Sequence, residues 1–202
     1  DCTVVLNLGG IANITIIPAK NTGQPTIGFD TGPANMLLDA WCQQHIGRPF
    51  DQGGQWASTG QVDNALLQRL LQHPFFQQAA PKSTGREHFG LVWLNAQLAD
   101  EDRVISAANV QATLTELTAL SVCQSITQTA QAAAGELIVC GGGAFNDFLL
   151  ARLAQHLPNW QIASSAGKGI DPQCVEALAF AWLARQAVLG LAGNLPAVTG
   201  AK

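Results

Sequence analysis

The stretch Thr3-Val4-Val5-Leu6-Asn7-Leu8-Gly9-Gly10 opens the sequence and decides the fold class. Its first six residues are β-branched or apolar except Asn7, which is typical of a buried strand, and the two glycines end it. A second strand is expected at Ile14-Thr15-Ile16-Ile17, where Pro18 stops it, so the pair predicts a hairpin. A third short strand is expected at 26–29, closed by a turn at Asp30-Thr31-Gly32-Pro33.

Farther along the chain, helical and extended patterns alternate. The sequence predicts helices at 35–45, 62–73, 106–134, 146–157 and 172–189, strands at 136–140 and 160–163, and loops at 50–54 and 81–86. Asn35 and Ser106 are expected to cap their helices, and Gly47 to end the first one. This alternation predicts an α/β fold with an at least partly parallel sheet.

Composition limits the possible partners. The 202 residues are 48% hydrophobic and 12% charged, with a net charge of −4, which excludes a disordered chain. The basic residues form no cluster, so neither a nucleic acid nor an anionic membrane is an expected partner. The most apolar stretch, 175–192, has an uncharged core at 177–184 only, which is too short to span a bilayer. We expect it to be a core helix of a soluble protein.

The cysteines indicate a reducing compartment. The five of them are far apart and form no CxxC pair, so neither a zinc site nor a disulfide framework is expected. We expect them to be small buried hydrophobes. No secretory signal opens the chain, and a cytoplasmic location is the expectation.

Two glycine-rich turns follow predicted strands, Gly9-Gly10 and Gly141-Gly142-Gly143. Glycines there let the backbone approach a ligand, and the second turn is expected to open a helix whose N-terminus attracts an anion. Each turn could also be only a tight connection; two of them, expected at opposite ends of the sheet, favour a ligand. Neither is a standard nucleotide motif, because Gly141-Gly142-Gly143 lacks the last glycine of the dinucleotide fingerprint. Lys168 is not followed by Ser or Thr, so it is expected to be a solvated loop lysine.

The order of the motifs resembles a known family. A strand ending in N-x-G-G-x-x-N-x-T precedes the motifs Phe29-Asp30-Thr31-Gly32-Pro33-Ala34-Asn35-Met36, Pro81-Lys82-Ser83-Thr84-Gly85-Arg86-Glu87, Ile138-Val139-Cys140-Gly141-Gly142-Gly143, Gly169-Ile170-Asp171-Pro172 with Glu176-Ala177, and Asn194-Leu195-Pro196-Ala197-Val198-Thr199-Gly200-Ala201. Over essentially all 202 residues this series resembles the C-terminal part of the anhydro-N-acetylmuramic acid kinases.

The resemblance implies a fold and a reaction. The fold is that of the actin/sugar-kinase/Hsp70 ATPases, in which ATP binds between two ribonuclease-H-like lobes, each with a mixed sheet flanked by helices. Residues 1–202 would form the C-terminal lobe, with the N-terminal lobe absent from this chain. The reaction opens the 1,6-anhydro ring of anhydro-N-acetylmuramic acid with water and phosphorylates O6, which gives N-acetylmuramic acid 6-phosphate for peptidoglycan recycling. ATP and Mg²⁺ are the implied cofactors.

Residue roles follow from the same resemblance. Asn7, Gly9, Gly10 and Asn13 correspond to the second phosphate loop, and Gly141, Gly142 and Gly143 to the adenosine-binding turn. Many members of the fold carry Asp at the position of Asn7, so a metal ligand is not implied there. Asp30 is a candidate for a water-mediated Mg²⁺ contact; the alternative is an Asx-turn before Gly32.

Glu176 has two interpretations. It either accepts a hydrogen bond from a sugar hydroxyl or simply favours the dipole of its helix. Arg86 and Glu87 are either a surface ion pair, which we favour, or a contact in the cleft.

The remaining catalytic parts are expected elsewhere. The resemblance places the first phosphate loop and the Asp base upstream, so we expect no catalytic residue in this chain and no activity from it alone. The expected partners are the sugar, the N-terminal lobe and, for the full-length protein, a second copy in a homodimer. The alternatives are an acetate- or hexose-type kinase of the same fold and a non-catalytic nucleotide-binding module.

Overall fold

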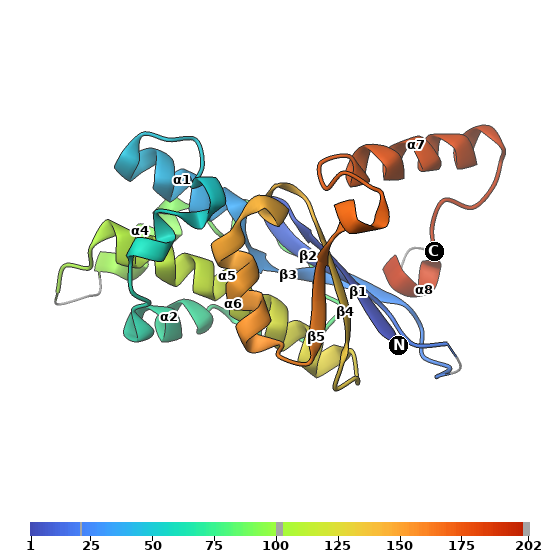
Figure 1. The fold of residues 1–202 in the computed structure, drawn as a ribbon, viewed down its shortest axis with the longest axis horizontal. Helices are drawn as coiled ribbons and strands as arrows, with labels where there is room; N and C mark the ends of the chain where they lie inside the picture. Colours follow the sequence, from blue (N-terminus) through green and yellow to red (C-terminus); the bar gives the residue numbers. More distant parts are fainter. Residues whose placement is uncertain (21, 100–102, 200–202) are drawn as a thin grey trace.

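The described residues form one five-stranded mixed sheet flanked by helices (Figure 1). The computed structural model describes residues 1–20, 22–99 and 103–199, so Gly200 and Ala201 of the last motif lie outside it. The strands are β1 (Cys2–Leu8), β2 (Ile11–Ile17), β3 (Ile27–Pro33), β4 (Gly135–Cys140) and β5 (Trp160–Ser164), in the spatial order β3-β2-β1-β4-β5. The predicted fold class, an α/β mixed sheet with helices on its flanks, is confirmed.

Strand β1 is central and joins the two halves of the sheet. It pairs antiparallel with β2, as the hairpin prediction required, and parallel with β4, which in turn pairs parallel with β5. The side chains of Cys2, Val4, Leu6 and Leu8 alternate into the core, which fixes the register of β1.

Strand β3 is longer than predicted. The turn expected at residues 30–33 is wrong, because these residues continue the strand and pair with β2 across a bulge at Ala12/Asn13. The bulge absorbs one register step, so the pairing continues to Pro33 despite the turn-like composition.

The helices of the described residues are α1 (Asn35–Ile46), α2 (Asn64–Leu71), α3 (Pro74–Gln77), α4 (Leu91–Ala99), α5 (Ala107–Thr129), α6 (Asp147–His156), α7 (Val175–Val188) and α8 (Pro196–Thr199). The five predicted helices are present with different ends, and α3, α4 and α8 were not predicted. Single 3₁₀ turns lie at η1 (Gln52–Gly54), η2 (Ala57–Thr59), η3 (Gly142–Phe145) and η4 (Ser165–Lys168).

Helix caps explain several of these ends. Ser106 caps α5 as predicted, with its hydroxyl accepting from the Asn109 amide at 3.3 Å. That helix ends five residues before the expected Ala134, where Gln131 takes a positive φ of 48° and the chain turns toward β4. Gly47, with a φ of 67°, ends α1 as predicted. Asn35 is not the cap of α1, because it lies inside the helix. Its side-chain amide nitrogen, Nδ2, donates to the Leu8 carbonyl at 2.8 Å.

Helix α5 joins two hydrophobic cores. One core lies between the sheet, the second half of α5 and α6, and the other between α1, α2, α4 and the first half of α5. Several of the hydroxyl groups that α5 buries are satisfied locally: Thr115 donates to the Gln111 carbonyl at 2.9 Å and Ser125 to the Ser121 carbonyl at 2.7 Å. Such back-bonding lets a helix with Thr and Ser on several sides pass through an apolar interior.

Helix α7 differs most from the prediction. It was expected to be a core helix, yet none of its residues is buried by the described parts of the chain, and Trp182 is 49% exposed. Figure 1 shows it standing away from the sheet. Cys174, just before it, is exposed as well, whereas the other four cysteines are buried as predicted. Among the described residues, no helix is both long and apolar enough to cross a bilayer.

Candidate functional site

The two glycine turns lie side by side at one edge of the sheet. The expectation that they occupy opposite ends is wrong, because β1 and β4 are parallel neighbours with Asn7 paired to Cys140. A Cβ on Gly141 would lie 2.5 Å from Asn7 Oδ1 and 2.8 Å from the Leu8 carbonyl oxygen. Gly141 also has a φ of 79°, so both its conformation and its contact with β1 require glycine. In open α/β sheets, ligands bind outside this edge of the parallel strands.

The Gly9-Gly10 turn is fastened to the start of α1. The Gly9 carbonyl accepts a hydrogen bond from the backbone amide of Asn35, and the Gly10 carbonyl accepts one from the backbone amide of Ala34, both at 3.0 Å. The first amides of α1 therefore bond to this turn, which fixes the position of its backbone relative to the helix.

Arg86 reaches the same turn from the 81–86 loop. A Cβ on Gly10 would lie 3.9 Å from Arg86 Nη2, so the guanidinium lies beside the turn. The favoured interpretation of Arg86 and Glu87 as a surface pair is not supported, because the Glu87 carboxylate lies 3.7 Å from the His88 ring instead. The resulting arrangement is a cation next to a glycine turn, which suits a phosphate.

A cavity of about 460 Å³ opens beside the triple-glycine turn. Its lining consists of Asn35, Leu38, Asp39, residues 50–53, Gly142, Gly143, Phe145, Asn146 and Gln173. Its apolar side chains are Leu38, Phe50 and Phe145, and the other lining residues are polar or glycine, in a volume typical of small-molecule sites. Gly142 and Gly143, expected in the adenosine turn, line the cavity, whereas Asn7, Gly9, Gly10, Asn13 and Gly141 lie outside its lining.

The triple-glycine turn does not lead directly into an α-helix. It forms the 3₁₀ turn η3, and α6 begins afterwards at Asp147 with Asn146 as its cap. The Asn146 side chain accepts from the Leu149 amide at 3.0 Å. The helix N-terminus thus lies at the cavity wall, one residue after the predicted start at Asn146.

Two carboxylates in the cavity were missed by sequence reasoning. Burial, and then the neighbouring Asp51, raise the pKa of Asp39 to about 6. Asp51 is held in place by the amides of Trp56 and Ala57, each donating at 2.8 Å. Only the tertiary fold brings the helix of Asp39 and the loop of Asp51 together, so no local pattern signals the pair.

Asp30 lies in a second cavity, of about 470 Å³, between β2, β3 and the 81–86 loop. Its Oδ2 accepts from the Ser83 hydroxyl and from the Thr84 amide, both at 2.9 Å. The Asx-turn alternative for Asp30 is therefore wrong: the carboxylate is held by a loop distant in sequence. Asn13, placed in the phosphate loop by the resemblance, pairs with Asp30 across β2 and β3 and also lines this cavity.

A metal would have few protein ligands here. The described residues contain no group of three or more His, Cys, Asp or Glu side chains that could hold an ion. Mg²⁺ usually keeps several of its waters and needs few protein ligands, and the Asp30 carboxylate, held by Ser83 and Thr84, can accept a hydrogen bond from such a water.

Lys168 and Glu176 lie at the two ends of the segment leading into α7. Lys168 is exposed to solvent as expected, and its ammonium also lies 2.6 Å from a Glu136 carboxylate oxygen. The Gly141 amide donates to the Pro172 carbonyl at 2.9 Å, and Gln173 lines the first cavity. Glu176, exposed in the first turn of α7, follows three residues later.

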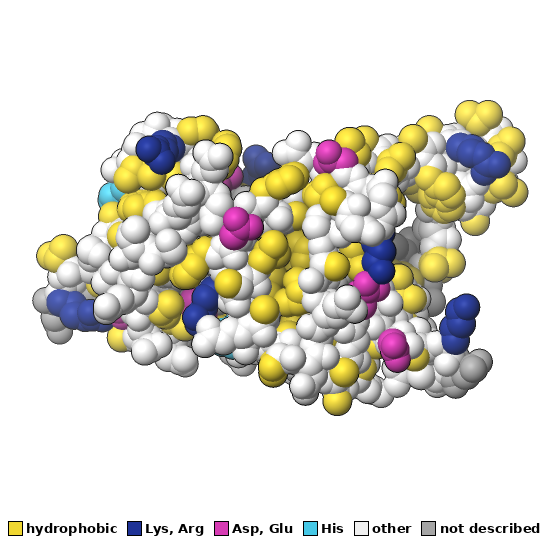
Figure 2. All heavy atoms as spheres, viewed as in Figure 1, with side chains coloured by type: hydrophobic (Ala, Val, Ile, Leu, Met, Phe, Trp, Pro, Cys, Tyr) yellow, Lys and Arg dark blue, Asp and Glu magenta, His cyan; other side chains and the backbone are white. Residues whose placement is uncertain are grey.

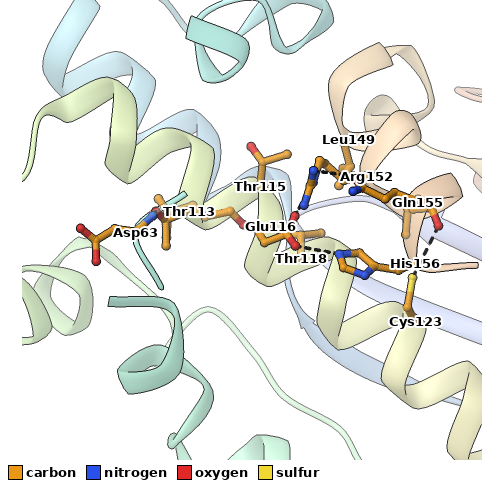
Figure 3. A network of polar contacts seen from close by, with 12 residues as sticks. Asp63, Thr113, Thr115, Glu116, Thr118, Cys123, Leu149, Arg152, Gln155 and His156 are labelled. Atoms are coloured by element: carbon orange, nitrogen blue, oxygen red, sulfur yellow. Dashed lines mark hydrogen bonds and ion pairs between the residues drawn. The ribbon is translucent and has the colours of Figure 1, made fainter. Parts of the chain in front are cut away.

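A buried ion-pair network holds α6 against α5 (Figure 3). Glu116, with its side chain 5% exposed, accepts from Arg152 Nε at 2.5 Å and from His156 Nε2 at 2.7 Å. Burial raises the pKa of Glu116, but the hydrogen bonds from Arg152 and His156 outweigh it and keep that pKa below its usual value. Because α6 starts at the cavity wall, this network also positions Asn146.

Comparisons with known proteins place the site in context. The sequence model of a family described as anhydro-N-acetylmuramic acid kinase matches residues 1–202. A relative of that name from Chromohalobacter salexigens is 52% identical over 202 residues, which cover 98% of this chain and 54% of the relative. Another from Psychrobacter arcticus is 50% identical over 217 residues, which cover 98% of this chain and 50% of the relative. The chain thus spans about half the length of these curated relatives.

Two solved structures share part of the architecture. One is an activator of the 2-hydroxyisocaproyl-CoA dehydratase from Clostridium difficile with bound ADPNP. Its TM-score is 0.48 at 14% sequence identity, and the overlay covers 85% of this chain and 55% of the activator chain. The other is a carbohydrate kinase from Novosphingobium aromaticivorans. Its TM-score is 0.44 at 15% sequence identity, and the overlay covers 81% of this chain and 36% of the kinase chain. Neither overlay is close enough to support a conclusion.

Proposed function

The chain belongs to the anhydro-N-acetylmuramic acid kinase family, and we propose that it supplies the C-terminal lobe of an ATP-dependent kinase acting on anhydro-N-acetylmuramic acid. The observation that carries the proposal is the meeting of the two glycine turns beside a cavity large enough for a nucleoside. We infer from the resemblance that the product is N-acetylmuramic acid 6-phosphate, that it feeds cell-wall recycling in the cytoplasm, and that the full-length protein is a homodimer.

The nucleotide part of the proposal assigns a role to each turn. Gly142 leaves room for the adenosine moiety, since a side chain there would enter the cavity, whereas Gly143 keeps the turn close to β1, because a Cβ there would lie 2.5 Å from Leu8 Cβ. Gly9 and Gly10 let the phosphates approach the backbone, and the Arg86 guanidinium beside them offsets their charge. ATP supplies the phosphoryl group when bound, and these residues bind and orient it.

The sugar part needs a water to attack the anomeric carbon and a carboxylate to take its proton. The bond from that carbon to O6 then breaks, and the freed O6 accepts the phosphoryl group. The resemblance places the base upstream of this chain. Asp30 has one oxygen engaged by Ser83 and Thr84, so the carboxylate is held in one orientation at the second cavity. It therefore suits either a water-mediated Mg²⁺ contact, which we favour, or the proton transfer itself.

Asp30→Asn in the full-length protein separates these two roles. If Asp30 orients a Mg²⁺-bound water, the Mg²⁺ concentration for half-maximal activity should rise about tenfold or more, and saturating Mg²⁺ should restore kcat, because only about 1.4 kcal/mol of binding is lost. If Asp30 takes the proton, kcat should stay low at every Mg²⁺ concentration. Ser83→Ala, which removes one support and keeps the carboxylate, is the matched control. Unchanged kinetics in Asp30→Asn would remove Asp30 from the site.

The proposed activity is tested on the full-length protein that contains this chain. We expect ATP-dependent conversion of anhydro-N-acetylmuramic acid into a product heavier by one water and one phosphoryl group (H2O plus HPO3), as measured by mass spectrometry. Faster turnover of acetate or a plain hexose would identify a different kinase. Nucleotide binding without transfer to any of these acceptors would identify a non-catalytic nucleotide-binding module.

A further inference from the structure

Helix α7 presents large apolar side chains to solvent on every side. We define the α7 surface as Leu178, Phe180, Trp182, Leu183, Val188 and Leu189, whose exposed fractions range from 39% to 86%. Leu178, Trp182 and Leu189 share one stripe at helical spacing, while Phe180 and Leu183 lie on other sides. Figure 2 shows hydrophobic side chains covering much of this helix.

Such a helix is not stable in water by itself. A helix that is apolar all round is normally buried, and an isolated helix of about 12–15 residues is marginal even with good helix formers. The fourteen residues of α7 contain only Glu176 and Arg185 as charged residues. The α7 surface therefore needs a partner that covers more than one side of the helix.

Both ends of α7 are tied to the rest of the fold near the candidate site. At its start, Pro172 accepts from the Gly141 amide and Gln173 lines the nucleotide cavity. After its end, the chain returns to the sheet, where Val198 Cγ1 lies 3.5 Å from the Cβ position of Gly28 on β3. A body covering α7 therefore sits on the same side as the glycine turns and both cavities.

We propose that the α7 surface is the docking site for the half of the family's chain that has no counterpart in these 202 residues, namely the N-terminal lobe. This inference rests on the proposed two-lobed kinase. The curated relatives are about twice as long as this chain, so a body of similar size is tethered to it at high effective concentration. Interfaces between permanently joined bodies resemble a core cut in half, which is the composition of the α7 surface.

The other possible occupants fit less well. A membrane surface attracts amphipathic helices that have a strongly basic face, whereas α7 has one Arg and no polar face. A second copy of the chain could cover one stripe of the helix through a two-fold contact. A further domain is then needed to cover the opposite side of the same helix. In the proposed two-lobed kinase, the N-terminal lobe is such a domain, and every copy carries it.

Photo-crosslinking in the full-length protein tests this proposal. Phe180→p-benzoylphenylalanine places a cross-linker on the α7 surface, and irradiation should give a monomer-sized product in which peptides of the N-terminal half are joined to α7. Val92→p-benzoylphenylalanine is the control, because Val92 is 88% exposed on α4 at the far side of the lobe (Figure 1). A dimer-sized product would assign α7 to a second copy and overturn the proposal, and so would the absence of any cross-link.

A stability measurement gives an independent readout. Trp182→Asp should lower the melting temperature of the full-length protein by about 4 °C or more, because it places a charge in a buried interface, while Val92→Asp should leave it unchanged. Equal melting temperatures for the two variants would contradict the proposal. Neither measurement depends on turnover, so a protein that lacks kinase activity but cross-links as expected would fail the proposed function and not this inference.

Discussion

At the scale of single residues, the three adjacent glycines of the cavity turn are glycine for different reasons. Gly141 combines a positive φ with a 2.5 Å approach to Asn7, and a Cβ on Gly143 would lie 2.5 Å from Leu8 Cβ. Gly142 has an ordinary φ, and its nearest neighbour would be Asn35 Nδ2 at 3.4 Å. Only Gly142 can therefore take a side chain without moving β1, and that side chain would enter the cavity.

This difference makes Gly142→Asp a test of the nucleotide site. In the full-length protein, the variant should weaken ATP binding at least about tenfold, or about 1.4 kcal/mol, because it adds both bulk and negative charge where the nucleotide binds. Titration calorimetry measures the change in Kd. Gly167→Asp is the matched control, since Gly167 also lies in a 3₁₀ turn and has open space around it. An unchanged Kd in folded Gly142→Asp would mean that the triple-glycine turn is only a connection.

Glu176 still has two roles to be separated, and Glu176→Gln does so while keeping the shape of the side chain. If the carboxylate accepts a bond from the sugar, kcat/KM for the anhydrosugar should fall about 10- to 150-fold, because a charge-assisted bond is worth about 1.5–3 kcal/mol. ATP binding should not change. Arg185→Gln, at the other end of the same helix, controls for the dipole, which is worth about 0.3–1 kcal/mol at either end. Wild-type kinetics with a slightly lower melting temperature would make Glu176 a structural residue.

Local sequence identified the glycine turns but misplaced several polar side chains around them. Asn35 has the chemistry of a helix cap, yet its side-chain amide donates to the Leu8 carbonyl at the end of β1. The Gly9-Gly10 turn already accepts hydrogen bonds from the start of α1. Asp30 precedes Thr-Gly-Pro and has the signature of a turn, yet it pairs within β3. In both cases the competing interaction comes from a strand or loop distant in sequence, which a local pattern does not contain.

At the scale of elements, α6 depends on a carboxylate that is almost completely removed from water. The Glu116 side chain is 5% exposed, while its partners Arg152 and His156 are 24% and 27% exposed. Losing the carboxylate and losing a cation from this network therefore have different costs. A cation left without Glu116 can still reach water, whereas Glu116 left without Arg152 keeps its charge in the interior.

Arg152→Met should thus destabilise the protein more than Glu116→Gln. At pH 7 we expect a loss of about 3 kcal/mol for Arg152→Met, as for breaking a buried pair, and a smaller loss for the double variant with Glu116→Gln. In the wild type, the lowered pKa of Glu116 gives stability that is present above its unfolded pKa and lost as pH falls through the folded one. In Arg152→Met the carboxyl can protonate, so the difference from wild type should shrink between pH 7 and pH 4 in urea unfolding. A loss that is equal at both pH values would contradict this account.

Element order could be predicted from the sequence, but element burial could not. Alternating and apolar runs predicted every strand of the described sheet and the hairpin, because β1 to β3 are neighbours in the chain as well as in space. The side of the sheet on which the turns meet depends on the parallel pairing of β1 with β4, which are more than a hundred residues apart. The apolar composition of α7 predicted a buried helix, and the partner that would bury it is not among the described residues.

At the scale of the whole molecule, the candidate site occupies one side of a prospective cleft. Two cavities, the Arg86 guanidinium and the exposed α7 all lie toward the edge where β1 and β4 end. The proposed nucleotide and sugar sites both lie on this lobe, but in-line transfer requires both reactants to be fixed within about an ångström of their reacting positions. A second lobe closing over this edge would supply that constraint and exclude water.

A protein made of these 202 residues alone should therefore show no measurable phosphorylation of anhydro-N-acetylmuramic acid. The physical reason is positional: without the facing lobe, a misplacement of about 1 Å already costs about a hundredfold in rate, and the expected base would be missing as well. The measurement is ATP-dependent product formation by the purified lobe, compared with the full-length protein at equal concentration. Adding the separately produced N-terminal half should restore turnover, and Trp182→Asp on α7 should weaken that restoration, whereas Val92→Asp should not. Turnover by the lobe alone near the full-length rate would place the whole catalytic machinery within these residues, and Asp30, the carboxylate held by Ser83 and Thr84, would then be the first candidate for the base.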